Sequence, residues 1–160
     1  MSVKDAFTAE EWQALLRLPL KIGVTLIVVS PSGPVGLMKE SAALAQAPFQ
    51  LARDGSASGL VSALALELQA QAKALMKEEQ SAFKQAQPQG YKAQTIAACQ
   101  GVAVALNKTS AEDAAAYRQW VLAVGQKVAE AAKDSGVLVS DAEKALLGEI
   151  SQALGAGASA

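Results

Sequence analysis

Apolar residues recur along most of this chain at the three- and four-residue spacing of helices, and short runs rich in proline, glycine and polar residues separate these periodic segments. The first periodic segment begins at a capping box, in which Thr8 and Glu11 satisfy each other's backbone donors. Phe7 and Trp12 are spaced as a hydrophobic staple across that box. We therefore predict a helix over residues 9–18.

The stretch after Pro19 has two interpretations, because this proline either breaks the first helix or opens a second one that runs to Ser30. Residues 24–29 are rich in β-branched side chains and would suit a strand. We predict a helix, since no second convincing strand is present to pair with them. The uncharged segment 22–29 is much shorter than the ~20 residues of a spanning helix. The stretch is therefore expected to be a core element.

Prolines and glycines divide the next part of the chain. Residues 30–34 hold two prolines and a glycine and predict a firm break. A helix is predicted over residues 35–47, and the sequence leaves open whether Pro48 ends it or kinks it. In the second case the helix continues to the turn at residues 54–56.

The longest predicted helix covers residues 57–85. The Gln-Pro-Gln-Gly segment at residues 87–90 ends it, and a further helix is predicted over residues 91–106, before a turn at 107–109. The apolar stripe of the long helix comprises Val61, Leu64, Leu68, Ala72, Leu75 and Phe83.

Two more capping signatures mark the remaining helices. Ser110 with Asp113 opens a helix predicted over residues 111–134, and Ser140 with Glu143 opens the last one. The apolar stripe of the first of these helices contains Tyr117, Trp120, Val121, Val124 and Val128.

The chain shows no internal repeat and no shift in composition that would mark a domain boundary. We predict an all-α fold, a single-domain bundle of six or seven helices over residues 1–154, followed by a flexible tail at residues 155–160. Alanine occupies about a fifth of the 160 positions and favours close helix packing.

The composition excludes several kinds of catalytic and metal-binding site. The chain has no histidine and one cysteine, which excludes catalytic relays and metal sites that use imidazole. Cys99 has small or apolar neighbours and is predicted to be a buried, inert thiol, as expected in a reducing cytoplasm. The net charge of -1 provides no overall field for nucleic acid.

The segment at residues 32–36, with Lys39 nearby, combines glycines, a predicted helix start and a lysine, as phosphate-binding loops do. Its spacing differs, because two residues instead of four separate Gly33 from Gly36, and Pro34 has no amide donor. We predict an ordinary turn at the start of a helix.

Adjacent acidic residues occur at positions 10–11, 78–79 and 112–113. Neighbouring helical side chains do not face each other, and acids in first turns interact favourably with the helix dipole. We interpret all three pairs as capping or solubilising residues. The sequence therefore predicts no catalytic residue, no cofactor and no metal site.

Two parts of the chain resemble known proteins. Residues 7–12 (FTAEEW) leading to 32–40 (SGPVGLMKE), together with 139–147 (VSDAEKALL), are similar to segments of small bacterial helical proteins. The last segment also resembles the final helix of tellurite-resistance TerB-like domains, although only one Asp-Gly pair, at 54–55, is present. The resemblance implies a bacterial source and a helical fold, and it transfers no functional residue.

For the function we expect a non-enzymatic cytoplasmic protein that binds a protein partner or forms a homo-oligomer, because the apolar run 22–29 adjoins a rigid loop. The alternative is a carrier of a lipid or other apolar small molecule in a cavity between helices. An enzyme ranks below both, and no nucleic-acid partner is expected. The apolar run 22–29 permits peripheral contact with a membrane, but it does not predict a membrane-spanning helix. The candidate residues for a ligand cavity or interface are Ile22, Leu26, Tyr117 and Trp120.

Overall fold

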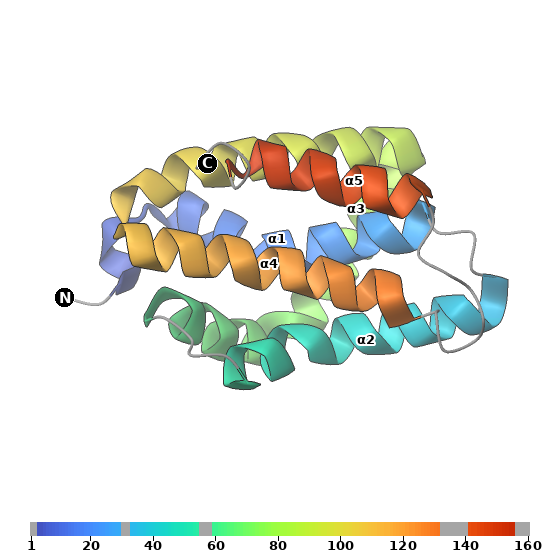
Figure 1. The fold of residues 1–160 in the computed structure, drawn as a ribbon, viewed down its shortest axis with the longest axis horizontal. Coiled ribbons are helices and arrows are strands. Elements are labelled where there is room, and N and C mark those ends of the chain that lie inside the picture. The colour runs from blue at the N-terminus through green and yellow to red at the C-terminus, as the bar shows by residue number, and fades with distance from the viewer. Residues whose placement is uncertain (1–2, 30–32, 55–58, 132–140, 156–160) are drawn as a thin grey trace.

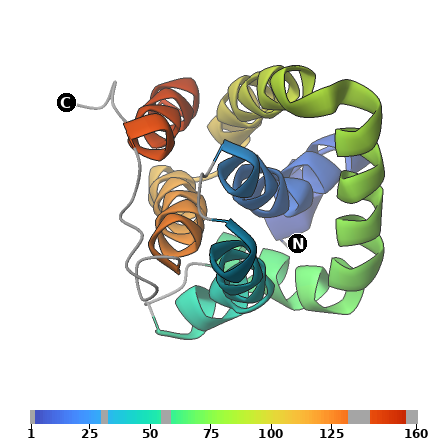
Figure 2. The same ribbon diagram turned by 90° about the vertical axis from the view of Figure 1, so that its right-hand side faces the viewer.

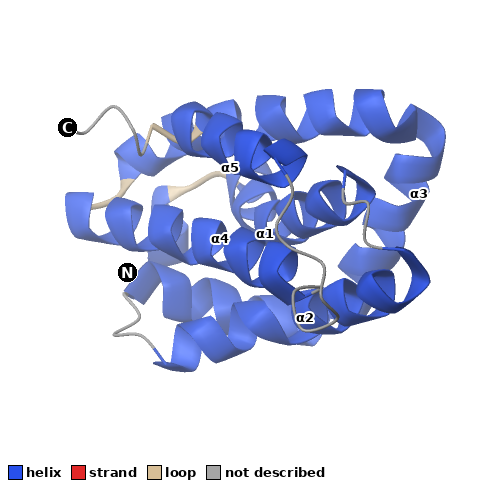
Figure 3. Ribbon diagram, turned by 45° about the vertical axis from the view of Figure 1, so that its right-hand side comes forward, coloured by secondary structure: helices blue, strands red, loops and turns tan. Residues whose placement is uncertain are grey.

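The computed structural model describes residues 3–29, 33–54, 59–131 and 141–155, which are helical almost throughout (Figure 3). These residues contain no strand, so the predicted all-α fold is confirmed. Counting the two arms of α3 separately, they form six α-helical segments, as predicted. The elements, in chain order, are η1 (Val3–Ala6), α1 (Ala9–Val29), α2 (Gly33–Asp54), α3 (Gly59–Ala105), η2 (Leu106–Lys108), α4 (Ala111–Ala131) and α5 (Asp141–Ala153).

Helix α1 lies at the centre of the bundle. Viewed along the bundle, α2, α4, α5 and both arms of α3 surround it (Figure 2). A helix with apolar residues on more than one face is stable when other helices pack against those faces. The apolar stretch noted in the sequence is therefore a core element, as predicted, and residues 22–29 are helical. The fully buried residues of α1 include Leu15, Leu16, Leu18, Ile22 and Leu26.

The predicted break at Pro19 was wrong, because α1 continues through this proline without interruption. Pro19 has no N–H to donate to the carbonyl of Leu15, one turn earlier. The Tyr117 hydroxyl of α4 donates to that carbonyl instead, at 2.8 Å. A side chain from another helix thus replaces the missing backbone donor, and the helix persists.

Helix α2 contains the second internal proline. Pro48 does not end the helix, which continues to Asp54. The indole N–H of Trp120 donates to the Pro48 carbonyl at 2.9 Å, so α4 also supports the backbone at this proline. The helix begins at Gly33, while residues 30–32 of the predicted break lie outside the described residues.

Helix α3 consists of two arms that bend around one side of α1 (Figure 2). The arms meet at Gln87, whose φ of 62° and ψ of 170° are not helical. The predicted end of the long helix at residues 87–90 is therefore confirmed at its first residue. The second arm ends at Ala105, one residue before the predicted end, and η2 occupies most of the predicted turn.

Two of the three capping predictions are confirmed. The Thr8 N–H donates to Glu11 at 2.8 Å, and the Glu11 N–H donates to the Thr8 hydroxyl at 3.1 Å. At α4, the Asp113 N–H donates to the Ser110 hydroxyl at 3.1 Å. Each such cap contributes about 1 kcal/mol to stability. Ser140, of the third box, lies outside the described residues.

Helices α4 and α5 cover one side of α1 (Figure 1). The described part of α4 ends at Ala131, so the last predicted turn of that helix, to residue 134, lies outside the described residues. Of the predicted C-terminal tail, residue 155 is described and 156–160 are not.

Candidate functional site

An apolar groove lies between the second half of α1, the second half of α2 and the first arm of α3. It contains two adjoining hollows of about 430 Å³ and about 420 Å³. Four lining residues are common to both hollows: Leu44, Ala45, Met76 and Gln80. The remaining lining residues are Leu20, Phe49, Ala72, Lys73 and Lys77 in the first hollow, and Val24, Ile27, Val28, Ser41 and Phe83 in the second.

The groove follows from a second apolar face on α1. Leu20, Val24 and Ile27 are spaced three and four residues apart and line the groove, whereas Ile22 and Leu26 point into the core. Alanines on α2 and α3 leave space opposite this face. Each hollow is within the ~300 to 1,000 Å³ that small-molecule sites occupy.

A third hollow of about 210 Å³ extends the groove toward the start of α3. It shares Phe49 with the first hollow and includes Leu66, whose side chain is 73% exposed. The lining residues on α3 thus run from Ser62 to Phe83, a helical rise of about 32 Å. The site is elongated along the seam between α2 and α3.

No protein-family model, curated protein sequence or solved structure matches this chain. The resemblance to TerB-like domains and to small bacterial helical proteins stays a prediction. Any assignment of function therefore depends on the side chains and on the groove they line.

The four residues proposed from the sequence as a ligand or interface site lie in the core, apart from the groove. Ile22, Leu26 and Tyr117 are 0% exposed and Trp120 is 4% exposed. The rings of Tyr117 and Trp120 pack edge to face at 5.9 Å, and both side chains hydrogen-bond to backbone carbonyls as described above. None of the four lines the hollows described here.

Ile22 and Leu26 pack against α4 at Gly125. A Cβ atom on this glycine would lie 3.1 Å from Ile22 Cγ2 and 3.1 Å from Leu26 Cδ1. Helices α1 and α4 therefore approach closely and leave no space for a ligand at that contact. The residues that do line the groove were missed, although the spacing of Leu20, Val24 and Ile27 was visible in the sequence.

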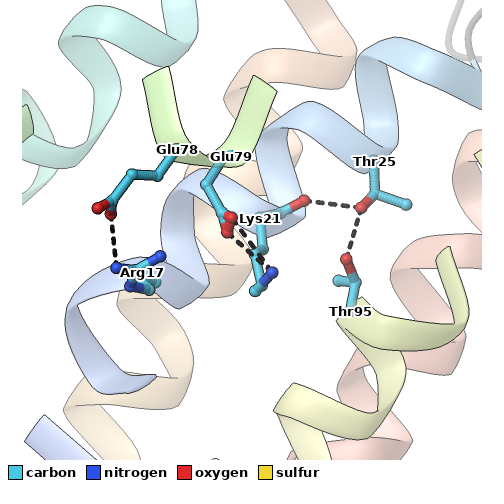
Figure 4. Close-up of polar contacts among 6 residues, drawn as sticks. All are labelled: Arg17, Lys21, Thr25, Glu78, Glu79 and Thr95. Carbon is cyan, nitrogen blue, oxygen red and sulfur yellow. Dashed lines mark hydrogen bonds and ion pairs between the residues drawn. The ribbon is translucent and has the colours of Figure 1, made fainter. Parts of the chain in front are cut away.

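A row of polar contacts joins α1 to both arms of α3 (Figure 4). Lys21 Nζ lies 2.8 Å from a carboxylate oxygen of Glu79, a residue that is 1% exposed. The Thr25 hydroxyl donates to the Lys21 carbonyl at 2.7 Å, and the hydroxyls of Thr25 and Thr95 lie 2.8 Å apart. The prediction that Glu79 is a capping or solubilising residue was therefore wrong.

Tyr91 completes this row on the second arm of α3. Lys21 Nζ lies 5.1 Å from the centre of its ring. Burial and the nearby charge of Glu79 raise the pKa of the Tyr91 hydroxyl well above its usual value. The row thus ties three helical segments together, and neither Lys21 nor Glu79 lines the groove.

Cys99 is fully buried on the second arm of α3, as predicted, and burial raises the pKa of its thiol to about 12. Such a thiol carries almost no thiolate at neutral pH. Among the described residues, no cluster of three or more acidic or cysteine side chains is arranged to hold a metal ion. None of the described helices combines the length and the apolarity needed to cross a bilayer.

Proposed function

We propose that this protein is a non-enzymatic binding protein for an apolar small molecule, which it holds in the groove between α1, α2 and α3. The observation that supports this proposal is the pair of adjoining apolar hollows of about 430 Å³ and about 420 Å³. A cytoplasmic location is part of the proposal, supported by the free, buried thiol of Cys99.

The shape of the groove favours an elongated ligand such as a single alkyl chain. Each methylene transferred from water contributes about 0.8 kcal/mol, or about a fourfold gain in affinity. Association itself costs at least about 4 kcal/mol, so short chains do not bind measurably. The proposal therefore implies an affinity that rises with chain length until the groove is filled.

The test is a competition titration with a fluorescent alkyl probe and a series of straight-chain alcohols of increasing length. We expect the affinity to increase about fourfold per methylene and then level off. Met76→Glu, which places a charge between the two hollows, should abolish binding. Val104→Glu is the matched control, because Val104 is 68% exposed on the other arm of α3. Absence of saturable binding for every chain length would contradict the proposal.

Self-association is a second candidate, in line with the interaction protein expected from the sequence. The supporting observation is that exposed Leu66 extends the groove beyond the two main hollows. An amphipathic helix of a second copy would place apolar residues along such a groove. Light scattering over a range of concentrations tests this candidate. A dimer that Leu66→Glu dissociates supports it, and a strict monomer at all concentrations rejects it.

A further inference from the structure

We propose that the ligand of the groove is a single-chain amphiphile with a carboxylate head, a fatty acid, and that Lys73 and Lys77 bind this head. The inference rests on the proposed function, because it assigns the polar end of the molecule whose alkyl chain occupies the groove.

The carboxylates of this arm face the N-terminal part of the chain. Each of them neutralises a basic side chain of η1 or α1, and two of these contacts are drawn in Figure 4. The pairs are Glu67 with Lys4 at 2.9 Å, Glu78 with Arg17 at 2.6 Å and Glu79 with Lys21 at 2.8 Å. The acidic side chains on this flank of α3 are thus already paired with cations.

Two of the three lysines of the same arm lie on the groove side. Lys73 and Lys77 are one helical turn apart, and both line the first hollow. The lining residues described for the two main hollows include no carboxylate. Within the described part of the chain, neither lysine takes part in an ion pair. Like charges at this spacing repel each other, and a bound anion relieves the repulsion.

The donors at this position suit a carboxylate. Lys73, Lys77 and Gln80 are the polar residues that line the first hollow, beside otherwise apolar residues. A carboxylate has two acceptor oxygens, one for each lysine, whereas a phosphate has a third strongly accepting oxygen. Lys73 and Lys77 are both exposed, so their ammonium groups stay hydrated at the mouth of the hollow while the chain enters it.

The experiment compares laurate, dodecanol and dodecyl phosphate, each below its aggregation concentration, in the same displacement titration at low salt. The variants are the wild type, Lys73→Gln/Lys77→Gln, and the control Lys127→Gln/Lys144→Gln on α4 and α5. We expect the wild type and the control to bind laurate about fivefold more tightly than dodecanol. The groove variant should lose this preference while its affinity for dodecanol stays within about twofold.

The outcomes separate this inference from the proposed function. If none of the three compounds binds, the proposed function is wrong and the inference fails with it. If laurate and dodecanol bind the wild type equally well, or the groove variant keeps the preference for laurate, the lysines do not select the head, whereas the groove remains a binding site. Tighter binding of dodecyl phosphate than of laurate overturns the assignment of a carboxylate. Circular dichroism and thermal melting confirm that each variant is folded.

Discussion

At the scale of single residues, the two prolines inside helices are each accompanied by an aromatic side chain of α4. Tyr117 donates to the carbonyl that Pro19 leaves without a donor, and Trp120 donates to the carbonyl of Pro48 itself. Both aromatic residues are buried, and at such a position the Leu15 carbonyl would be costly to leave unsatisfied. The same residues were candidates for a binding site in the sequence, because aromatic residues on an apolar stripe can either fill the core or line a cavity between helices.

Substitution of Tyr117 by Phe tests this role. Tyr117→Phe leaves the buried carbonyl of Leu15 without a partner and should lower the free energy of unfolding by about 1 to 3 kcal/mol. Pro19→Ala restores an N–H one turn after that carbonyl. The loss caused by Tyr117→Phe should therefore be smaller in the Pro19→Ala background. Urea denaturation of the four proteins of this double-mutant cycle measures the difference. Equal losses in both backgrounds would show that the two residues are not coupled.

At the scale of elements, the bend between the arms of α3 is made by a residue with an unusual backbone. Gln87 has a φ of 62° and a ψ of 170°, a conformation that glycine adopts far more readily than other residues. Pro88 follows it and disfavours helical geometry at the preceding residue. The position at which α3 turns is thus determined locally, whereas the direction of the second arm depends on its packing against α1.

Gln87→Gly should raise the free energy of unfolding by about 1 kcal/mol, because it removes the strain of a left-handed conformation. The matched control is Gln85→Gly, at an exposed helical position two residues earlier, which should lower stability by about 1 kcal/mol. Chemical denaturation of both variants gives the two values. A loss of stability in both would indicate that position 87 carries no strain.

At the scale of the whole molecule, the ion pair of Lys21 and Glu79 lies where the central helix meets the bend of α3. The side chain of Glu79 is 1% exposed and that of Lys21 is 18% exposed, so the pair is much less hydrated than its neighbour, Arg17 with Glu78, at 32% and 56%. A buried pair costs desolvation free energy and need not increase stability over an apolar pair of the same size. Its geometry does favour one register of α1 against both arms of α3.

Breaking this pair on one side should destabilise the whole bundle. Lys21→Met leaves the Glu79 carboxylate buried without its cation, and we expect a loss of about 3 to 5 kcal/mol. The double variant Lys21→Met/Glu79→Met should recover most of that loss, since neither charge remains. Arg17→Met, which breaks the neighbouring exposed pair, is the control and should cost at most about 1 kcal/mol. Thermal or urea unfolding measures all three, and equal losses for Lys21→Met and Arg17→Met would contradict the burial argument.

The sequence by itself determined the helical class, most helix boundaries, two helix caps and the burial of the apolar stretch in the core. These features depend on interactions within a few residues, such as the reciprocal bonds of Thr8 and Glu11, or on the apolar periodicity of one helix. The turn at Gln87 was predicted for the same reason. Local chemistry and one-dimensional patterns carry this information directly.

Only the tertiary structure decided which helices continue through proline, which carboxylate is buried and where the groove lies. The continuity of α1 at Pro19 depends on Tyr117, about a hundred positions away in the chain. Glu78 and Glu79 are adjacent in sequence, yet only the second faces the buried side of α1. The groove combines faces of three helices whose relative placement no single helix encodes. Such features arise from contacts between distant segments, and these contacts are set when the whole chain packs.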